Sequence, residues 1–554
     1  YNVRLGIFVF AFYPWWVSSR LLCCPVRLCP SSKVTLVAPS SSLKAVRDVE
    51  QITPLVAVVD VRNRSAEEFA LEHPGISLVC SEVTRVDADQ NEAKLASGGS
   101  IAFDRCCLAT GASPSLSYTH PRVIGIRDNE SVANLSKQLA DARRVLIVGN
   151  GGIALELVQA LTSAQACQIV WAVRDAYVGN TFFDPNASAF LLPSLSAYGK
   201  SREAPIPSKN SPPSPPPSRA AAFCGASLGP AWLKTLNIAA YRGSSTRQED
   251  TEECRQQPLL DIQFECELDD VRDGKGSEIN DGPHWPVSAT LTNGVVVDCD
   301  FVISATGAKP NTNALGDQFE RGHDGGFVVD ERMRVVHSCG RADDKDKIPH
   351  LSIFAAGDCC CLEWPERESA HWFQMRLWSQ AREMGLFTAK CMADSVDELS
   401  GGAFDLFVHA TRFFSHKVVL LGRFNGQGLG KSVQEFVSTH LVLNSDDDVR
   451  LQGGAVAVGS GEGSSFPIDR RHEAIKVRTG NSKFSGDVQV LVRTSPGAEY
   501  IKVILVGGRV RGAMLVGDTG LEETFENLIL SGTNVSDVGA DLLSLDVDVE
   551  DFFD

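Results

Sequence analysis

The sequence predicts an α/β protein with two Rossmann-like nucleotide-binding domains, one of them split around the other, followed by a C-terminal α+β domain. Three observations support this prediction. Short apolar strands alternate with helical patterns over residues 1–400. A Gly-rich turn follows one of these strands at residues 149–154. Two alternating strands joined by a Gly-Gly pair occupy residues 499–518, and a chain of 554 residues suffices for about three domains.

Buried parallel strands are the elements that the sequence indicates most clearly, because each of these runs is short, β-branched and apolar on both faces. We predict them at residues 33–39, 144–149, 168–174, 298–307 and 351–358. Helices are expected at residues 40–52, directly after the first of these strands, and at residues 521–532, ending at Gly532.

Three segments have compositions that cannot supply a packed core. Residues 201–219 are rich in Pro and Ser, and residues 431–487 are polar and Gly-rich, so we expect both insertions to be disordered. Residues 546–554 are acidic and should form a solvated tail.

Composition excludes several classes of protein. The net charge of −17 and the pI near 5.2 argue against nucleic-acid binding, which requires clustered Lys and Arg. The apolar run Leu5–Val17 is shorter than the ~20 residues of a membrane span, so no membrane partner is expected. Sixteen cysteines with no C-x-x-C spacing indicate free thiols and no metal site. We expect a soluble protein of the cytoplasm and nucleus with small-molecule ligands.

The segment VLIVGNGGIALE at residues 145–156 has the properties of a dinucleotide site. Gly149 permits the strand-to-helix turn, Gly151 lets the backbone approach a pyrophosphate, and Ala154 allows close packing of helix and strand. The helix beginning near Gly152 would direct its first amides at the phosphates. We also assign Glu156, the last residue of this segment, to the cofactor site.

The tip of the following strand normally reads the cofactor ribose, and two charged residues stand there. Arg174 could pair with the 2′-phosphate of NADPH, whereas Asp175 could accept a hydrogen bond from the free 2′-hydroxyl of NADH. Both alternatives therefore stay open, together with the structural one of two solvated charges.

Three further motifs surround this turn: CLATGASP at residues 107–114, ISATGAKPN at residues 303–311 and IFAAGDCC at residues 353–360. In this order they resemble the flavin-dependent pyridine nucleotide-disulfide oxidoreductase superfamily. The resemblance implies an FAD domain at residues 1–142 and 308–400, split around an NAD(P)H domain at residues 143–307, with the α+β domain at residues 401–554. The implied flavin-binding residues and domain crossings are Thr110, Gly111, Thr306, Gly307, Gly357 and Asp358, whose carboxylate would bind the ribityl chain.

The reactive cysteine pair of that superfamily is missing, because the expected helix at residues 40–52 contains no cysteine. Segments such as NTFFD (residues 180–184) and QMRLWSQAREMG (residues 374–385) are similar to a family within it that also lacks the pair and is linked to oxidative-stress defence. Lys44 stands where relatives keep the redox cysteine and could stabilise the reduced flavin, or lie on the surface. Trp372 and Trp378 are expected in the core.

The resemblance implies hydride transfer from NAD(P)H to FAD and then to an unknown acceptor; a protein client is a further possible partner. The alternative is a catalytically silent scaffold that binds a nucleotide or a protein. The first segment supports this alternative. In residues 1–32, Gly6 is the only glycine and no G-x-G-x-x-G turn exists. Two explanations are open: the flavin site is degenerate, or the first segment is wrong because the start of the chain is truncated or misread. We favour the second.

Overall fold

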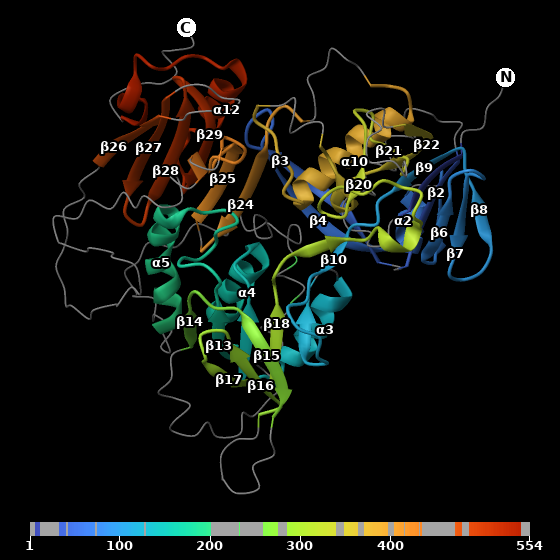
Figure 1. Cartoon of the computed structure of the whole chain (residues 1–554), viewed down its shortest axis with the longest axis horizontal. Coiled ribbons are helices and arrows are strands. Elements are labelled where there is room, and N and C mark those ends of the chain that lie inside the picture. Colours follow the sequence, from blue (N-terminus) through green and yellow to red (C-terminus); the bar gives the residue numbers. More distant parts are fainter. Residues whose placement is uncertain are drawn as a thin grey trace, which may run out of the picture.

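The computed structural model describes residues 6–10, 33–39, 42–72, 75–126, 129–164, 166–200, 232, 236, 259–274, 285–338, 348–363, 370–396, 404–414, 416–430, 433–434, 471–478 and 487–544. These residues form three bodies, which Figure 1 shows from one side. One is built from both ends of the first 400 residues, one is inserted into it, and the third follows them. Among the described residues, no helix is long and apolar enough to cross a membrane.

The first body contains a six-stranded sheet in the order β21-β22-β9-β1-β2-β5. All neighbours pair in parallel except β21 (Arg334–Val336), which is antiparallel at the edge. The other members are β1 (Gly6–Phe10), β2 (Lys33–Ala38), β5 (Ile76–Cys80), β9 (Arg105–Leu108) and β22 (Pro349–Ala355). This order makes β1 a central strand, so part of the segment that we expected to be abnormal supplies the first strand of the sheet.

The inserted body has a five-stranded parallel sheet in the order β11-β18-β12-β13-β14. Its strands are β11 (Val123–Gly125), β12 (Arg144–Val148), β13 (Gln168–Ala172), β14 (Leu260–Gln263) and β18 (Phe301–Ser304). Helices α3 (Asn129–Leu139), α4 (Gly152–Ser163) and α5 (Pro185–Lys200) belong to this body, and the antiparallel strands β15 (Leu268–Asp273), β16 (Val287–Leu291) and β17 (Val296–Cys299) complete it. The predicted strands in this region are confirmed with shorter bounds.

The chain passes between these two bodies through a short two-stranded ribbon. Strand β10 (Ala112–Pro114) follows the first Ala-Thr-Gly turn, and β19 (Ala308–Pro310) follows the second. The two strands pair antiparallel, with Pro114 opposite Ala308. The two similar motifs therefore lie side by side, as the resemblance implies.

The third body is an antiparallel sheet in the order β24-β25-β29-β28-β27-β26. The members are β24 (Val408–Phe413), β25 (His416–Gly422), β26 (Arg471–Arg478), β27 (Asp487–Ser495), β28 (Glu499–Val506) and β29 (Arg509–Val516). Gly507 and Gly508 form the predicted turn with φ of 57° and 74°, and α12 (Glu522–Ser531) ends at the left-handed Gly532. The predicted hairpin and helix are both confirmed.

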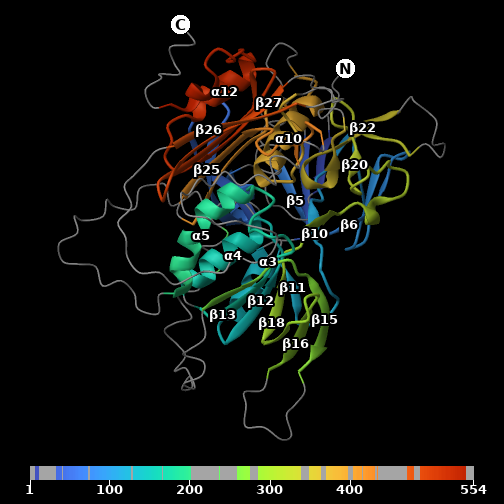
Figure 2. The ribbon, with the colours of Figure 1, turned by 60° about the vertical axis from the view of Figure 1, so that its left-hand side comes forward.

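Alternate residues of this sheet enter two different cores, because successive side chains of a strand point to opposite faces. One face, with Ile501, Val503 and Leu515, packs beneath α12. The other face, with Tyr500, Ile504 and Met514, shares a core with α4 and α5 of the inserted body. Figure 2 shows α4 and α5 beside this sheet from a second direction.

Two sequence predictions are wrong. Residues 42–51 form the strand β3 (Ser42–Gln51), paired antiparallel with β4 (Ala57–Ser65), and not a helix. Residues 471–478, expected to be disordered, form β26 next to β27. The predicted insertion at residues 201–219 and the acidic tail at residues 546–554 lie outside the described residues.

Candidate functional site

The Gly-rich turn connects β12 to α4, and its first glycine is required by packing. Gly149 adopts a φ of +130°, and a Cβ on it would overlap the carbonyl oxygen of Ala305 and lie 2.6 Å from the carbonyl carbon. The indole nitrogen of Trp171 donates to the carbonyl of Gly149 at 2.7 Å. Only glycine therefore lets this turn pass so close to the chain that follows β18.

The second half of the turn leaves the beginning of α4 open. Gly151 is the residue before the helix and has no side chain that could cap it, while Gly152 is the first helical residue. A Cβ on Gly151 would find only the hydroxyl of Thr181, at 3.7 Å. Ala154 is fully buried between helix and sheet. Free amides behind an open backbone surface fit a pyrophosphate, so this end of the inserted body suits a dinucleotide.

Asn150, which the sequence analysis did not single out, connects this turn to the tip of the next strand. Its amide nitrogen donates to the carboxylate of Asp175 and to the carbonyl of Tyr177, both at 2.9 Å. The side chain of Asp175 is 24% exposed, whereas that of Arg174 is 67% exposed and 4.0 Å from the Asp175 carboxylate. Asp175 therefore helps to hold the turn, and Arg174 extends into solvent beside it.

Glu156 is placed differently from the other predicted nucleotide-binding residues. It lies on the buried side of α4, 1% exposed, where the indole nitrogen of Trp232 donates to its carboxylate. This position is a packing position within the inserted body, and it does not support the cofactor-binding role that we assigned to Glu156.

The two Ala-Thr-Gly turns hold each other at the crossing between the bodies. Thr110 donates to the carbonyl of Asn311 at 2.5 Å, and Thr306 donates to the carbonyl of Ser115 at 2.6 Å. Gly111 and Gly307 have positive φ values of 65° and 103°, and a Cβ on either would have no neighbouring atom within 4 Å. These glycines thus leave open backbone surface at the crossing, while the threonine hydroxyls stabilise it.

The Gly-Asp motif follows β22 at the carboxyl edge of the first sheet. Gly357 has a φ of +80°, and Asp358, half-buried, is the second residue of a short 3-10 helix, Gly357–Cys359. Arg376 holds this segment: its Nε donates to the carbonyl of Asp358 at 2.9 Å, and its guanidinium pairs with Asp324. Arg376 adopts a φ of +52°, a conformation that costs a non-glycine residue about 1–3 kcal/mol and is common at functional sites.

Within the described residues, the body that the resemblance assigns to FAD presents groups suited to a flavin at the Gly-Asp motif. The carboxylate of Asp358 and the left-handed Gly357 suit a ribityl chain. At the other end, strand β1 stops at Phe10, and the following residues 11–32 contain no glycine and lie outside the described part of the chain. Lys44 belongs to β3, where its backbone is opposite Asn63, so the expected helix that would present it to a flavin does not exist.

Buried thiols surround the Gly-Asp motif, and those of Cys106, Cys107, Cys359 and Cys360 form no disulfide. Burial raises the pKa of Cys106, Cys107 and Cys360. Cys359 differs, because a hydrogen bond from Cys360, followed by hydrogen bonds from the backbone amides of Thr110 and Gly111, lowers its pKa to about 7 despite its burial. Of these four thiols, the one that ionises most readily is therefore the one that follows Asp358.

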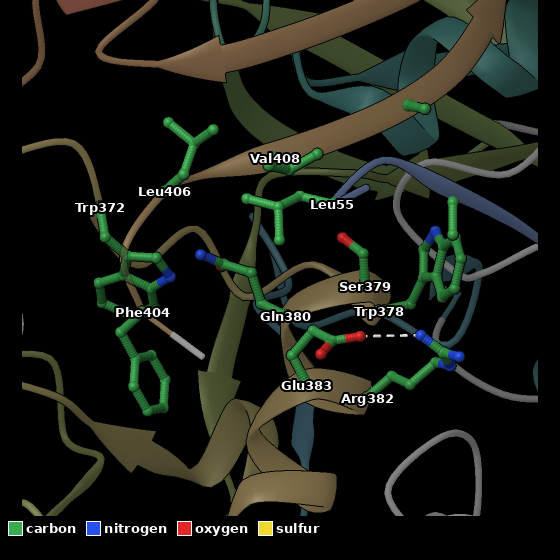
Figure 3. Close-up of a pocket in the computed structure, with 12 residues that line it drawn as sticks. Leu55, Trp372, Trp378, Ser379, Gln380, Arg382, Glu383, Phe404, Leu406 and Val408 are labelled. Carbon is green, nitrogen blue, oxygen red and sulfur yellow. Dashed lines mark hydrogen bonds and ion pairs between the residues drawn. The ribbon is translucent and has the colours of Figure 1, made fainter. Parts of the chain in front are cut away.

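A pocket that opens to solvent lies where α10 (Trp378–Met392) meets β24 and the turn between β3 and β4. Figure 3 shows the indoles of Trp372 and Trp378 on either side of it, with Ser379 and Glu383 between them. The remaining lining residues are Leu55, Ala57, Gln380, Arg382, Phe404, Leu406, Val408 and Ala410. Both tryptophans are buried as predicted, and they line this pocket.

The imidazole of His409 lies behind this pocket. Its Nδ1 is 3.1 Å from the hydroxyl of Ser379, its ring stacks on Phe182, and its Nε2 has no hydrogen-bond partner within the described structure. Burial lowers the pKa of His409 from 6.5 to about 3. The ring is therefore neutral and buried at neutral pH.

We expect this histidine to destabilise the fold in acid. Because its folded pKa is below its unfolded pKa, its contribution to stability is complete above pH 6.5 and is lost as the pH falls toward 3. Between pH 7 and pH 5 the loss is about 2 kcal/mol. We expect the free energy of unfolding, measured with urea, to fall between pH 7 and pH 5 by about 2 kcal/mol less in the variant His409→Phe than in the unchanged protein. An unchanged pH dependence would contradict the assignment.

Comparison with known proteins identifies the family. The family described as pyridine nucleotide-disulphide oxidoreductase matches residues 24–199 and 252–385. Among solved structures, a ferredoxin reductase from Rhodopseudomonas palustris is similar with a TM-score of 0.60 and 14% identity, covering 98% of this chain and 99% of that one. An engineered water-forming NADPH oxidase bound to NADPH has a TM-score of 0.58 and 13% identity, with 96% and 92% covered. These likenesses show the fold.

The sequence relatives are more specific. A human protein, pyridine nucleotide-disulfide oxidoreductase domain-containing protein 1, is 35% identical over 554 aligned residues, which cover 95% of this chain and 93% of that protein. The match spans all three bodies, and it confirms the family that the sequence motifs indicate. The chain therefore belongs to the pyridine nucleotide-disulfide oxidoreductase domain-containing protein 1 family.

Proposed function

We propose that this chain is an NAD(P)H-dependent flavin oxidoreductase that passes electrons to an acceptor other than an active-site disulfide. The observation that supports this most directly is the turn Gly149–Gly152, whose open backbone leads into the uncapped beginning of α4. FAD, when bound, would supply the hydride-accepting ring. The chain would supply Asp358 for the ribityl chain, Arg376 to hold the Asp358 segment, and the glycines of the inserted body for the nicotinamide dinucleotide.

The disulfide step is excluded from the proposal because no cysteine occupies residues 40–57, the first segment after β2. That segment forms most of the β3–β4 hairpin, whose turn docks on α12: the amide of Leu55 donates to the carboxylate of Glu526 at 3.2 Å. The hairpin is thus a structural connection to the third body. The acceptor must then be a diffusible molecule or a partner protein.

A visible spectrum of the purified chain tests the proposal. Flavin absorbance at one FAD per chain, bleached under anaerobic conditions by NADPH or NADH, is the expected result. The variant Asp358→Ala should retain less flavin at the same protein concentration. Absence of flavin absorbance after incubation with FAD would overturn the oxidoreductase proposal.

A second function, a nucleotide-binding scaffold without turnover, is favoured by one observation. The residues that follow β1 are Ala-Phe-Tyr-Pro-Trp-Trp at positions 11–16, where a Gly-rich turn would have to approach the FAD pyrophosphate. Binding of NADPH, measured by its fluorescence, in a chain that takes up no FAD would support this second function.

We further propose that NADPH is preferred over NADH. Asp175 is engaged by Asn150, while the exposed guanidinium of Arg174 can turn toward a 2′-phosphate. The similar NADPH oxidase is an engineered protein whose five substitutions remove an aspartate and introduce two arginines, and its parent from Lactobacillus brevis binds NADH. This chain also has an arginine at this strand tip, Arg174, but it keeps Asp175, which is held by Asn150.

The variant Arg174→Ala tests this preference. Its affinity for NADPH should fall about tenfold or more, because a charge-assisted contact contributes about 1.5–3 kcal/mol, whereas its affinity for NADH should not change. Arg143→Ala is the matched control, since Arg143 precedes the amino end of β12, at the other end of the strand from the nucleotide turn, and pairs with Asp300. Equal losses for both nucleotides would contradict the proposal.

A further inference from the structure

A group of metal-ligating side chains lies beyond the Gly-Asp motif and has no role in the function proposed above. A ring nitrogen of His323, the Sγ of Cys361 and a carboxylate oxygen of Glu363 all lie within 4.8 Å of one another. The Sγ of Cys361 is 4.0 Å from the imidazole nitrogen. Imidazole, thiolate and carboxylate bind Zn²⁺ at about 2.0–2.3 Å. Each of the three ligand atoms would therefore need to move by less than about 1 Å to bind the same ion.

Two glycines place the histidine beside the cysteine. Cys361 lies in β23 (Cys360–Cys361), which pairs in parallel with β20 (Phe327–Val328). A Cβ on Gly322 would overlap the Sγ of Cys361, and a Cβ on Gly326 would be 2.6 Å from the carbonyl carbon of Cys360. The loop at residues 322–326 can therefore press against β23 only with glycine at both positions, and His323 is carried by this loop.

The loop is also held from the side by charge. One carboxylate oxygen of Asp324 accepts the amide of Gly326 at 2.8 Å, and the other pairs with Arg376. Asp324 is thus paired with Arg376, and it also accepts a hydrogen bond from the Cys361 thiol, which a bound ion would replace. The Cys361 thiolate and the Glu363 carboxylate would bring two negative charges to a bound ion, which together balance a divalent cation.

The three side chains differ in exposure, and this difference leaves a route from solvent to the site. Cys361 is buried, Glu363 is partly buried and His323 is exposed. An ion could enter from solvent on the histidine side, and a water molecule could fill the fourth position. Three protein ligands with one open position is a common arrangement for zinc.

We propose that His323, Cys361 and Glu363 form a binding site for one divalent transition-metal ion of the zinc class. Binding replaces the proton of the Cys361 thiol, which is released to solvent, and forms one bond each to sulfur, nitrogen and oxygen without any change of oxidation state. The ion joins the loop that precedes β20 to the chain five residues after Asp358. It is independent of the nucleotide function.

Cobalt substitution tests the site in the full-length chain. The protein is reduced, treated with chelator and titrated with Co²⁺, and the thiolate-to-cobalt charge-transfer band in the near ultraviolet reports a sulfur ligand. We expect one Co²⁺ per chain with this band, and its displacement by Zn²⁺. No charge-transfer band, or a stoichiometry well below one, overturns the proposal.

Substitutions separate this site from adventitious binding. Cys361→Ser should abolish the band, and His323→Ala should weaken Co²⁺ binding about a hundredfold or more, since loss of even an outer contact costs about 10–100-fold. Cys80→Ser, which removes an exposed thiol in β5, should change neither result. Far-ultraviolet circular dichroism verifies that each variant is folded. A band that persists in Cys361→Ser overturns the assignment.

Discussion

The variant Lys502→Met should lose about 3–5 kcal/mol of unfolding free energy, because it leaves a buried carboxylate without its cation. Lys502 and Asp184 are 1% and 2% exposed, and their ion pair joins β28 to the residue just before α5. Lys502 also donates to Asn425 at 2.5 Å, and Tyr500 donates to Asp184 at 3.4 Å. Urea unfolding, monitored by tryptophan fluorescence, should show this loss as a lower free energy of unfolding.

Two further variants distinguish this pair from an ordinary ion pair. Asp184→Asn combined with Lys502→Met should recover much of the loss, because neither side chain is then charged, while an amide oxygen can still accept the amide of Ala187. Arg272→Met breaks the exposed pair with Asp270, where the arginine is 79% exposed, and should cost at most about 1 kcal/mol. Equal losses in Lys502→Met and Arg272→Met would contradict the argument.

The two glycines of the nucleotide turn should respond differently to the same methyl group. Gly149→Ala should destabilise the fold by about 2–4 kcal/mol, because its Cβ overlaps the carbonyl oxygen of Ala305 and its φ is +130°. Gly151→Ala should change stability by no more than about 1 kcal/mol, since the nearest atom to its Cβ is 3.7 Å away.

Nucleotide binding should fail in both variants, for different reasons. In Gly149→Ala the turn itself is displaced, whereas in Gly151→Ala the methyl group occupies the surface that the pyrophosphate approaches. We expect the affinity of Gly151→Ala for NADPH to fall at least about tenfold, a loss of ~1.4 kcal/mol, in a fluorescence titration. Unchanged affinity in a stable Gly151→Ala protein would show that the phosphates do not bind at this turn.

Local patterns predicted the elements whose partners are close in sequence. The run Arg144–Val148, the turn and α4 form one strand-turn-helix unit, so the glycine spacing was sufficient. The hairpin of β28 and β29 could be predicted equally well. Alternating apolar and polar residues indicate the strands, and Gly507–Gly508 indicates the turn. In both cases, the information lies within about twenty residues.

Prediction failed where a distant partner decides the conformation. Leu43, Val46, Val49 and Ile52 recur every three residues, which suits one face of a helix. The Val-rich β4 nevertheless provides a complete antiparallel partner, and β-branched residues favour a strand when such a partner exists. The same limit explains Glu156, whose partner Trp232 is 76 residues away.

The inserted body is a separate segment of the chain, but it shares a hydrophobic core with the C-terminal sheet. Pro114 and Ala308, at the ends of the inserted segment, are opposite each other in the β10–β19 ribbon, so the segment could be excised from the chain with little strain. Excision would nevertheless expose the apolar faces of α4 and α5 that now cover Tyr500, Ile504 and Met514. The inserted body and the C-terminal sheet should thus unfold as one cooperative unit, and the inserted body cut out alone should aggregate.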